Sequence, residues 1–278
     1  MTGATRPCQA MPVTLNERIQ ISNGVDAQCI EAAERFHRRS SLLRRSRFGL
    51  EITPYQEHAV HALTHGRQTR LAEHHVDAID LACHADPGLR RKKSVRSFAR
   101  GPALHYRLLM DILYLSFCAD TDAEQPRPYA SAGGCYPVHA VLLPLVPVEE
   151  APFGADSILH VAAQERALYA LSGHGALNAA VTCLDGMPGQ EADTFANAAF
   201  IIVYVIDLEV ATLRYAERGY RFALIETGLM AQQATLVTEQ RGLRSCMFGG
   251  FPDAELCAAL GLNPKKMLVC MTQIFGYL

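Results

Sequence analysis

Residues 199–207, AFIIVYVID, form an unbroken apolar run of mostly β-branched and aromatic side chains. A strand without polar alternation has no face to offer to water, so this run predicts a strand at the centre of a sheet. Four more strands are predicted, at VHAVLLPLV (138–146), SILHVAA (157–163), LRSCMF (243–248) and KMLVCMTQIF (266–275). Long helical segments separate the strands, which is typical of an α+β or mixed α/β layered domain.

Helical patterns occupy much of the remaining chain. Helices are predicted at residues 26–37, 53–65, 70–84, 104–117 and 252–260, with one further helix that runs from residue 214 to a terminating Gly242. The breaker Asp86-Pro87-Gly88 lies between two parts of different texture. We therefore expect an Arg- and His-rich, mainly helical extension over residues 1–88 and a second domain over residues 89–278.

The bulk composition argues against several classes of protein. A net charge of −2 and a pI of about 6.6 give no general attraction to nucleic acid or anionic lipid. The N-terminus has no apolar signal-peptide core, and no run reaches the ~18 apolar residues of a membrane span. Nine scattered cysteines without a CxxC pair indicate reduced thiols. We expect a cytoplasmic protein with no nucleic-acid or membrane partner.

The basic segment KKSVR is a candidate phosphate site. Lys92, Ser94 and Arg96 alternate along it and could project together from an extended segment. Two cations and a hydroxyl suit a phosphate group. A solvated run of charges is the simpler alternative for this segment taken alone.

Two glycine-containing loops beside predicted strands are candidate sites for a flat ligand. In PYASAGGCYP (128–137) the relevant residues are Ser131, Gly133 and Gly134, and in FGGF (248–251) they are Gly249 and Gly250. Without a Cβ atom, the backbone can approach a ligand closely. An ordinary loop and a tight strand-to-helix connection are the alternatives.

The segment RYAERGYRFALIETG (214–228) is an unusual helix. Two interior glycines, Gly219 and Gly228, each cost roughly 1 kcal/mol relative to alanine, which predicts close packing at both positions. Its arginines share one face of a continuous helix, with a tyrosine beside the first: Arg214, Arg218, Arg221 and Tyr215. Nearby guanidiniums favour the ionised form of a phenol, whereas burial opposes it. The alternative is a surface helix whose arginines pair with Glu209 and Glu217.

The histidines and the N-terminal arginines give weaker signals. His58, His61 and His65 share a helical face, but no spacing of a known metal site accompanies them, so no metal is predicted. The arginine-rich stretch 35–47 is either a solvated face or a surface for an acidic peptide or partner.

The order of these segments resembles the FMN-dependent nitroreductase superfamily. The resemblance rests on RKKSVRSF, RPYASAGGCYPVHAVLL, RYAERGYRFALIETGLMAQQATLVTEQRGL and GGFPDAELCAALGL, and it covers about residue 90 to the C-terminus. Within that superfamily the chain is similar to the SagB-type thiazole/oxazole dehydrogenases, especially the azoline oxidase subunits of microcin biosynthesis. The resemblance implies an α+β nitroreductase-like fold, with a central mixed β-sheet flanked by helices and an N-terminal helical extension.

The same resemblance implies a cofactor, partners and site residues. Such enzymes bind FMN, usually as homodimers with the flavin between subunits. They oxidise thiazolines and oxazolines of a precursor peptide beside cyclodehydratase subunits of a synthetase. By position, the FMN phosphate would contact Lys92, Ser94 and Arg96, and the flavin would contact Ser131, Gly133, Gly134, Gly249 and Gly250.

The sequence departs from this family at one catalytic position. Relatives carry Lys-Tyr before the RGYR string, whereas this chain has Arg214-Tyr215. Arginine stays protonated in proteins and cannot act as a general base. We therefore expect Tyr215 to take the proton. The alternatives are another base, loss of the standard reaction, an NAD(P)H-dependent oxidoreductase of small molecules, or a non-catalytic scaffold subunit.

Overall fold

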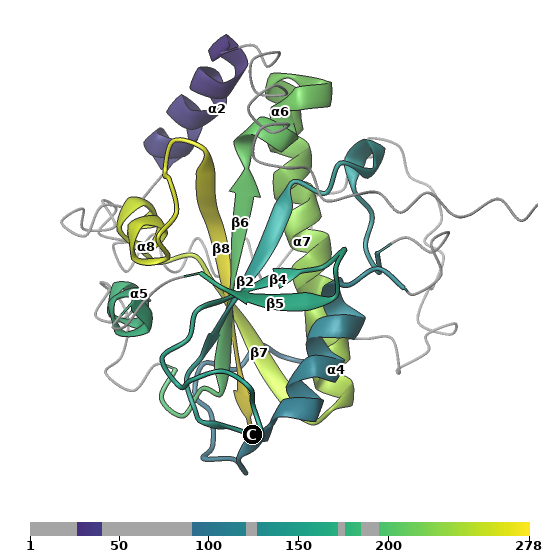
Figure 1. Cartoon of the computed structure of the whole chain (residues 1–278), viewed down its shortest axis with the longest axis vertical. Helices are drawn as coiled ribbons and strands as arrows, with labels where there is room; N and C mark the ends of the chain where they lie inside the picture. Colours follow the sequence, from purple (N-terminus) through teal and green to yellow (C-terminus); the bar gives the residue numbers. More distant parts are fainter. Residues whose placement is uncertain (1–26, 41–90, 121–126, 172–175, 185–194) are drawn as a thin grey trace, which may run out of the picture.

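A computed structural model describes residues 27–40, 91–120, 127–171, 176–184 and 195–278. The predicted helices at 53–65 and 70–84, and with them His58, His61 and His65, lie outside the described residues. The chain builds a six-stranded sheet in the order β5-β4-β2-β6-β8-β7 (Figure 1). These strands are β5 (Ala167–Ala170), β4 (Leu159–Ala162), β2 (Val138–Pro144), β6 (Phe200–Asp207), β8 (Met267–Tyr277) and β7 (Leu243–Phe248).

Both kinds of strand pairing occur in the structure. Every neighbouring pair of the six-stranded sheet is antiparallel. A parallel pair forms separately between β1 (Leu104–His105) and β3 (Val148–Glu149). The four strands predicted around 138–146, 157–163, 243–248 and 266–275 are confirmed, whereas β1, β3 and β5 were not predicted, because each has only two to four residues and lacks a clear pattern.

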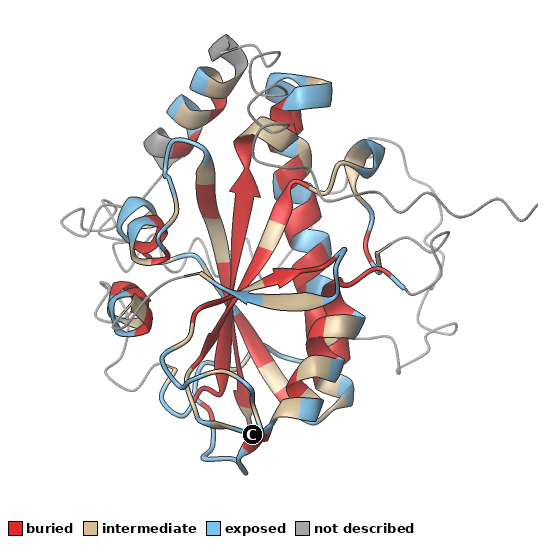
Figure 2. Cartoon of the chain, viewed as in Figure 1, coloured by how far each residue is buried: buried red, intermediate tan, exposed pale blue. Residues whose placement is uncertain are grey.

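Strand β6 is the centre of the domain, as its sequence predicts. It lies between β2 and β8, and all eight of its residues are buried (Figure 2). Ile202, Tyr204 and Ile206 face one apolar core. The alternate residues Ile201, Val203 and Val205 face a second core on the other side. The strand therefore needs no polar alternation, since helices cover both faces of the sheet.

The helices form a layer on each side of the sheet. On one side, α4 (Tyr106–Phe117) packs against the long helix α7 (Glu217–Gln240) over the first core. On the other side, α5 (Ala176–Leu184) and α8 (Asp253–Ala259) cover the second core. From the N-terminal part, α2 (Ala27–Ser40) packs against α6 (Leu208–Tyr215) and α7 (Figure 1). None of the described helices is both long and apolar enough to cross a membrane.

The prediction of one continuous helix from residue 214 is wrong. Helix α6 ends at Tyr215, Ala216 adopts φ 49° and ψ −139°, and α7 starts at Glu217. The two helices pack closely beside the break, since a Cβ atom at Gly219 would lie 1.7 Å from the Ala211 carbonyl oxygen. The predicted terminal glycine is confirmed, since Gly242 follows α7 with φ 80°.

The two glycines of α7 have different surroundings. The predicted close packing is confirmed at Gly219, which is buried against the end of α6. It is wrong for Gly228 within this chain, because a Cβ atom there would meet no atom within 4 Å. Gly228 lies on an exposed side of α7 beside Leu229 and Ile225, so solvent or a second protein faces it.

Candidate functional site

The glycine loop contacts the end of α6. Arg214 donates a hydrogen bond from Nη1 to the carbonyl oxygen of Gly133 over 3.1 Å. Gly133 has φ 61°, and a Cβ atom there would lie 2.6 Å from the Tyr215 hydroxyl. The structure thus brings Gly133, Arg214 and Tyr215 together, although 81 residues separate Gly133 from Arg214. Only glycine fits this position without displacing the tyrosine or straining the backbone.

A buried carboxylate lies under the same loop. The Ser131 hydroxyl accepts a hydrogen bond from the Tyr136 amide over 2.8 Å and also bonds to Glu226. Glu226 is 2% exposed and accepts a 3.4 Å hydrogen bond from the Val138 amide. Burial raises the pKa of Glu226, although the bonds from Ser131 and Val138 and the charge of Arg127 oppose this shift. Glu226 therefore fixes the loop from the helix side.

Glu226 was missed by the sequence analysis. The available signal was its position, since it falls on the buried side of α7 with Ala223, Thr227 and Met230. A carboxylate at a buried helical position needs hydrogen-bonding partners, which marks it as a structural or functional residue. Ser131, in contrast, was predicted for the right loop, but its hydroxyl points to Glu226 and the Tyr136 amide.

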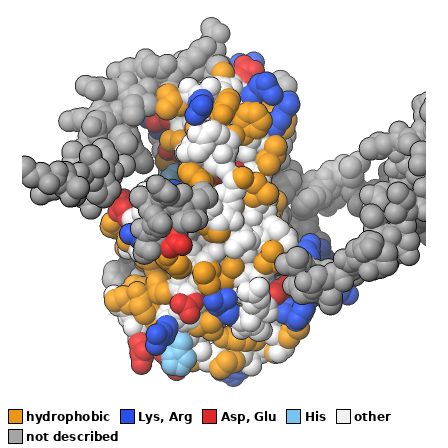
Figure 3. All heavy atoms as spheres, turned by 90° about the vertical axis from the view of Figure 1, so that its right-hand side faces the viewer, with side chains coloured by type: hydrophobic (Ala, Val, Ile, Leu, Met, Phe, Trp, Pro, Cys, Tyr) orange, Lys and Arg blue, Asp and Glu red, His pale blue; other side chains and the backbone are white. Residues whose placement is uncertain are grey.

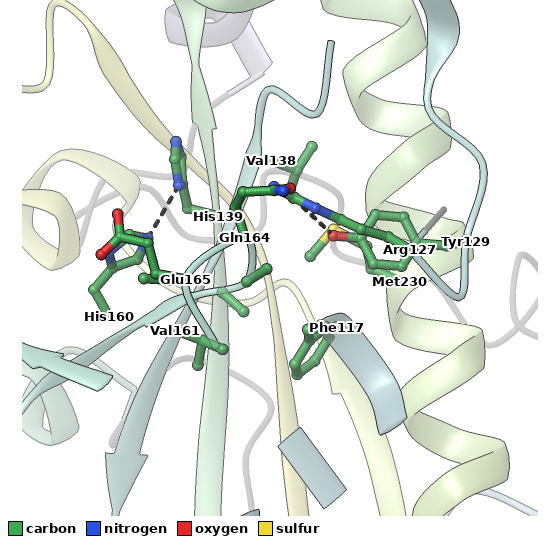
Figure 4. A pocket seen from close by; sticks show the side chains of 13 residues that line it. Phe117, Arg127, Tyr129, Val138, His139, His160, Val161, Gln164, Glu165 and Met230 are labelled. Carbon is green, nitrogen blue, oxygen red and sulfur yellow. Dashed lines mark hydrogen bonds between the residues drawn. The ribbon is translucent and has the colours of Figure 1, made fainter. Parts of the chain in front are cut away.

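Arg127 extends the polar network behind the loop. Its guanidinium lies 4.2 Å above the Tyr136 ring and donates a 3.3 Å hydrogen bond to the Tyr129 hydroxyl. Burial raises the pKa of Tyr129 to about 12, so this phenol is protonated at neutral pH. Both residues line a cavity of about 180 Å³, together with His139 and His160, whose ring nitrogens are 3.1 Å apart (Figure 4).

The basic segment lies at the other end of α7. Lys92, Ser94 and Arg96 are exposed and line one open hollow. The Lys92 amide donates 3.0 Å hydrogen bonds to both carboxylate oxygens of Glu239, in the last turn of α7. The Val95 amide donates to the Ser245 carbonyl of β7 over 3.3 Å. The three predicted side chains therefore share a surface where they can hold an anion.

The second glycine pair lies on the same side as the basic segment. Gly249 and Gly250 directly follow β7, and a Cβ atom at Gly249 would have only the Met271 sulfur, at 3.8 Å, within 4 Å. The Arg96 carbonyl accepts a 2.9 Å hydrogen bond from the Phe195 amide, and the Phe195 ring packs on Phe248 at 4.9 Å. Backbone without side-chain cover is thus available beside the basic segment.

The predicted residues form two clusters within one chain. The first, the loop cluster, contains Ser131, Gly133, Gly134, Arg214 and Tyr215. The second, the basic cluster, contains Lys92, Ser94, Arg96, Gly249 and Gly250. Arg214 and Tyr215 come directly before α7, whereas Lys92 is bonded to its last turn. Residues 217 and 239 lie about 33 Å apart along the helix, so Arg214 and Lys92 of one chain do not meet around one small ligand.

The predicted arginine face is not formed. The break at Ala216 separates Arg214 from Arg218 and Arg221, both of which are exposed. The Arg218 guanidinium lies 5.6 Å from the centre of the Phe222 ring. The alternative pairing with Glu209 is not formed either, since Glu209 contacts Lys266 at 2.6 Å. Of these arginines, Arg214 is the one that reaches the glycine loop.

The family model described as the nitroreductase family matches residues 89–277, which is more than half of the chain. The chain belongs to the nitroreductase family. The fold expected from the sequence motifs is therefore confirmed. The matched region contains every residue of the loop cluster and the basic cluster.

Individual relatives agree with this assignment. The chain is 28% identical over 178 residues to the microcin B17-processing protein McbC of Escherichia coli, a match that covers 62% of each protein. It is 27% identical over 187 residues to the putative nitroreductase MJ1384 of Methanocaldococcus jannaschii, with 65% of this chain and 86% of the relative covered.

A solved structure shares the fold over nearly the whole chain. A chain in the E. coli microcin synthetase McbBCD complex with truncated pro-MccB17 bound superposes with a TM-score of 0.79 at 23% identity. The superposition covers 94% of this chain and 97% of that chain, so it extends into the N-terminal part, beyond the family match.

Proposed function

We propose that this nitroreductase-family protein is an FMN-dependent dehydrogenase that oxidises azoline rings of a ribosomally made peptide to azoles, as a subunit of a synthetase. The observation that carries the proposal is the contact of Arg214 and Tyr215 with Gly133. It joins the two most specific motifs that the chain shares with azoline dehydrogenases. Similarity to McbC supports the choice of a peptide substrate and synthetase partners.

The residues present fit FMN. The cations Lys92 and Arg96 and the hydroxyl of Ser94 line one exposed hollow, as a phosphate site requires. Gly134 and Gly249 offer backbone without a Cβ atom to a flat ring, whereas Gly133 leaves room for the Tyr215 hydroxyl. FMN, when bound, supplies the hydride acceptor of the oxidation.

The protein supplies the proton acceptor and the positioning. Aromatisation of an azoline removes a proton from Cα, which requires a base next to the ring. Tyr215 is half-buried at the loop, and we assign this step to its phenolate oxygen, which becomes the hydroxyl on taking the proton. Arg214 cannot accept a proton. Its hydrogen bond to Gly133 instead fixes the loop beside Tyr215.

A homodimer would join the two clusters that one chain keeps apart. Apolar side chains are spread over the side of the molecule that carries α4 and α7 (Figure 3). On α7 an exposed stripe, the α7 stripe, consists of Leu224, Ile225, Gly228 and Leu229. If two copies pack along this stripe with antiparallel α7 helices, the loop cluster of one copy lies beside the basic cluster of the other. We propose that FMN binds at these two composite sites.

The substitution Ile225→Glu tests the dimer. Ile225 is 56% exposed in the single chain, so glutamate is tolerated there by the fold but introduces a charge into an apolar interface. We expect a dimer to become a monomer in analytical ultracentrifugation and to lose bound FMN.

The matched control for this test is Tyr169→Glu. Tyr169 is 49% exposed on the edge strand β5 and is not part of the α7 stripe. The Tyr169→Glu variant should stay dimeric and keep its bound FMN. A monomeric wild-type protein that still binds FMN tightly would contradict the composite site.

Binding of FMN and riboflavin tests the basic cluster. Arg96→Ala removes a charge-assisted hydrogen bond worth about 1.5 kcal/mol or more, so the affinity for FMN should fall about tenfold or more. The affinity for riboflavin, which lacks the phosphate, should not change. Fluorescence titration measures both, and Arg100→Ala, at another exposed arginine, is the control. If Arg96→Ala lowers the affinities for FMN and riboflavin equally, Arg96 does not contact the phosphate.

An azoline peptide tests the reaction itself. Incubated with the FMN-loaded protein and O2, each azoline ring should lose two hydrogen atoms, which mass spectrometry detects. An unchanged peptide, together with rapid bleaching of the flavin by NAD(P)H, would favour an oxidoreductase of small molecules. An unchanged peptide without such bleaching would favour a non-catalytic flavin-binding subunit.

A further inference from the structure

Helix α2 lies outside the family-matched region but packs on the part of the domain that carries Tyr215. The family match begins at residue 89, whereas α2 covers Ala27–Ser40. In the folded chain, α2 lies against both α6 and α7, the two helices on either side of Ala216 (Figure 1). The side of α2 that faces these helices is buried, since Ala33 is 5% exposed and His37 is 7% exposed.

The contact between α2 and the domain is polar and specific at its centre. His37 Nδ1 lies 2.8 Å from the hydroxyl oxygen of Tyr220, and this hydrogen bond is buried. His37 Nε2 lies 3.7 Å from an oxygen of Asp253, the first residue of α8. The Phe36 ring packs edge-on against Tyr220 at 5.9 Å. One histidine thus links α2 to two helices of the family domain.

Tyr220 is well placed to transmit this contact to the catalytic residues. It follows Gly219, whose backbone lies against the carbonyl of Ala211 in α6. Four residues before Tyr220, Ala216 has a positive φ of 49°. Such a conformation costs a non-glycine residue of order 1 to 3 kcal/mol and persists only where surrounding contacts enforce it. Arg214 and Tyr215 come directly before Ala216, so whatever holds the break also orients them.

We infer that α2 is a brace for the catalytic end of α6, in which His37 acts through Tyr220 to hold Arg214 and Tyr215 against the glycine loop. His37 is a positioning residue, because it contacts Tyr220 and Asp253 and acts on the reacting groups through Tyr220. The catalytic part of this inference rests on the proposed function. The docking of α2 does not, and it can be measured by itself.

The charge state of His37 makes the brace sensitive to pH. Burial lowers the pKa of His37 to about 4, although Asp253 alone would favour the charged ring. Tyr220 faces His37 from α7, and Glu34 lies one turn earlier on α2. On α6, Glu209 pairs with Lys266, and Arg214 donates a hydrogen bond to the Gly133 carbonyl.

The sign of the pH effect follows from proton binding. An undocked histidine has a pKa near 6.5, so between pH 6.5 and 4 the undocked state binds more protons. Docking of α2 should therefore be strongest above pH 6.5 and weaken as the pH falls toward 4.

A single tryptophan makes the docking of α2 visible. The chain contains no tryptophan, so Phe36→Trp introduces a unique fluorophore next to Tyr220. Phe36 is 58% exposed, which leaves room for the larger ring. In the FMN-loaded protein, we expect the emission to shift as the pH falls from 6.5 toward 4. His37→Asn, which keeps a hydrogen-bonding group at the position of Nδ1 but does not titrate, should abolish that shift.

Turnover of the azoline peptide tests the catalytic role. His37→Ala and Tyr220→Phe should each lower kcat about fivefold, the effect of one buried hydrogen bond, with little change in KM. The double variant should be no slower than either single variant. His37→Asn should restore most of the loss. Arg35→Ala, on the outward side of α2, is the control, because Arg35 pairs with Glu31 at the surface.

Three results would overturn parts of this inference. If the tryptophan emission does not shift between pH 6.5 and 4, His37 does not control the docking of α2. If α2 is released but kcat does not change, His37 has no positioning role in catalysis. If His37→Ala does not fold, the milder Tyr220→Phe variant carries the same test. A wild-type protein without azoline turnover would contradict the proposed function but leave the emission test of docking intact.

Discussion

Tyr215→Phe is expected to lower azoline turnover about a hundredfold or more, with FMN still bound, because removal of a general base typically costs this much. The phenyl ring keeps its packing, since the Tyr215 ring lies edge-on to Phe222 at 5.1 Å. Only the hydroxyl is lost. That oxygen lies 2.6 Å from where a Cβ atom of Gly133 would be, at the loop we assign to the flavin. Steady-state kinetics and the flavin absorbance bands measure the two outcomes.

The neighbouring arginine offers a matched comparison. Arg214→Lys creates the Lys-Tyr pair that the resemblance to azoline dehydrogenases implies for this position, and it keeps a cation that can donate to the Gly133 carbonyl. We expect this variant to stay within about tenfold of wild type, since it removes no base. Near-wild-type turnover of Tyr215→Phe would show that another group takes the proton. A larger loss in Arg214→Lys than in Tyr215→Phe would move the decisive role to residue 214.

The sheet could be predicted from the sequence because its signal is local. The run 199–207 is apolar at every position except its terminal aspartate, and the structure buries all of β6 between two cores. Asp207 then begins α6, where its carboxylate accepts hydrogen bonds from the amides of Glu209 and Val210. The short strands β1 and β3 were missed because two residues carry too little pattern.

The break between α6 and α7 could not be predicted from local sequence. Residues 214–221 contain good helix formers, and residue 216 is alanine, the residue type with the highest helix propensity. The break depends on the contact of Gly219 with the Ala211 carbonyl, which exists only once the two helices cross. Tertiary packing therefore overrides local propensity here, and it also removes the arginine face that a continuous helix would have formed.

The residues of the candidate site could be proposed from the sequence, but their arrangement in space could not. Motif resemblance selected Gly133, Arg214 and Tyr215, and the structure places them in contact. No sequence signal could show that Lys92 would be bonded to the far end of α7, because that depends on where residues 91–96 cross Glu239. The distance between Arg214 and Lys92 within one chain is the reason for proposing a second copy of the chain at this site.

Gly219→Ala should destabilise the protein strongly, although alanine is the better helix former by roughly 1 kcal/mol. The added methyl group would lie 1.7 Å from the Ala211 carbonyl oxygen and 2.6 Å from its carbon. Both atoms belong to the backbone, so no side-chain rotation relieves the overlap, and α6 must move away from α7. Overpacking of this kind typically costs about 1 to 3 kcal/mol or more, which exceeds the gain in helix propensity.

Thermal unfolding followed by circular dichroism measures this effect, and Gly228→Ala is the matched control on the same helix. A Cβ atom at Gly228 meets no atom within 4 Å, so there the helix propensity alone should raise the stability by up to about 1 kcal/mol. Both substitutions are compared in the Ile225→Glu background, where a second copy does not cover the α7 stripe. Because Arg214 and Tyr215 lie at the end of the displaced helix, a folded Gly219→Ala protein that keeps Ile225 should also lose turnover. Equal melting temperatures for the two glycine variants would show that α6 and α7 do not cross this closely.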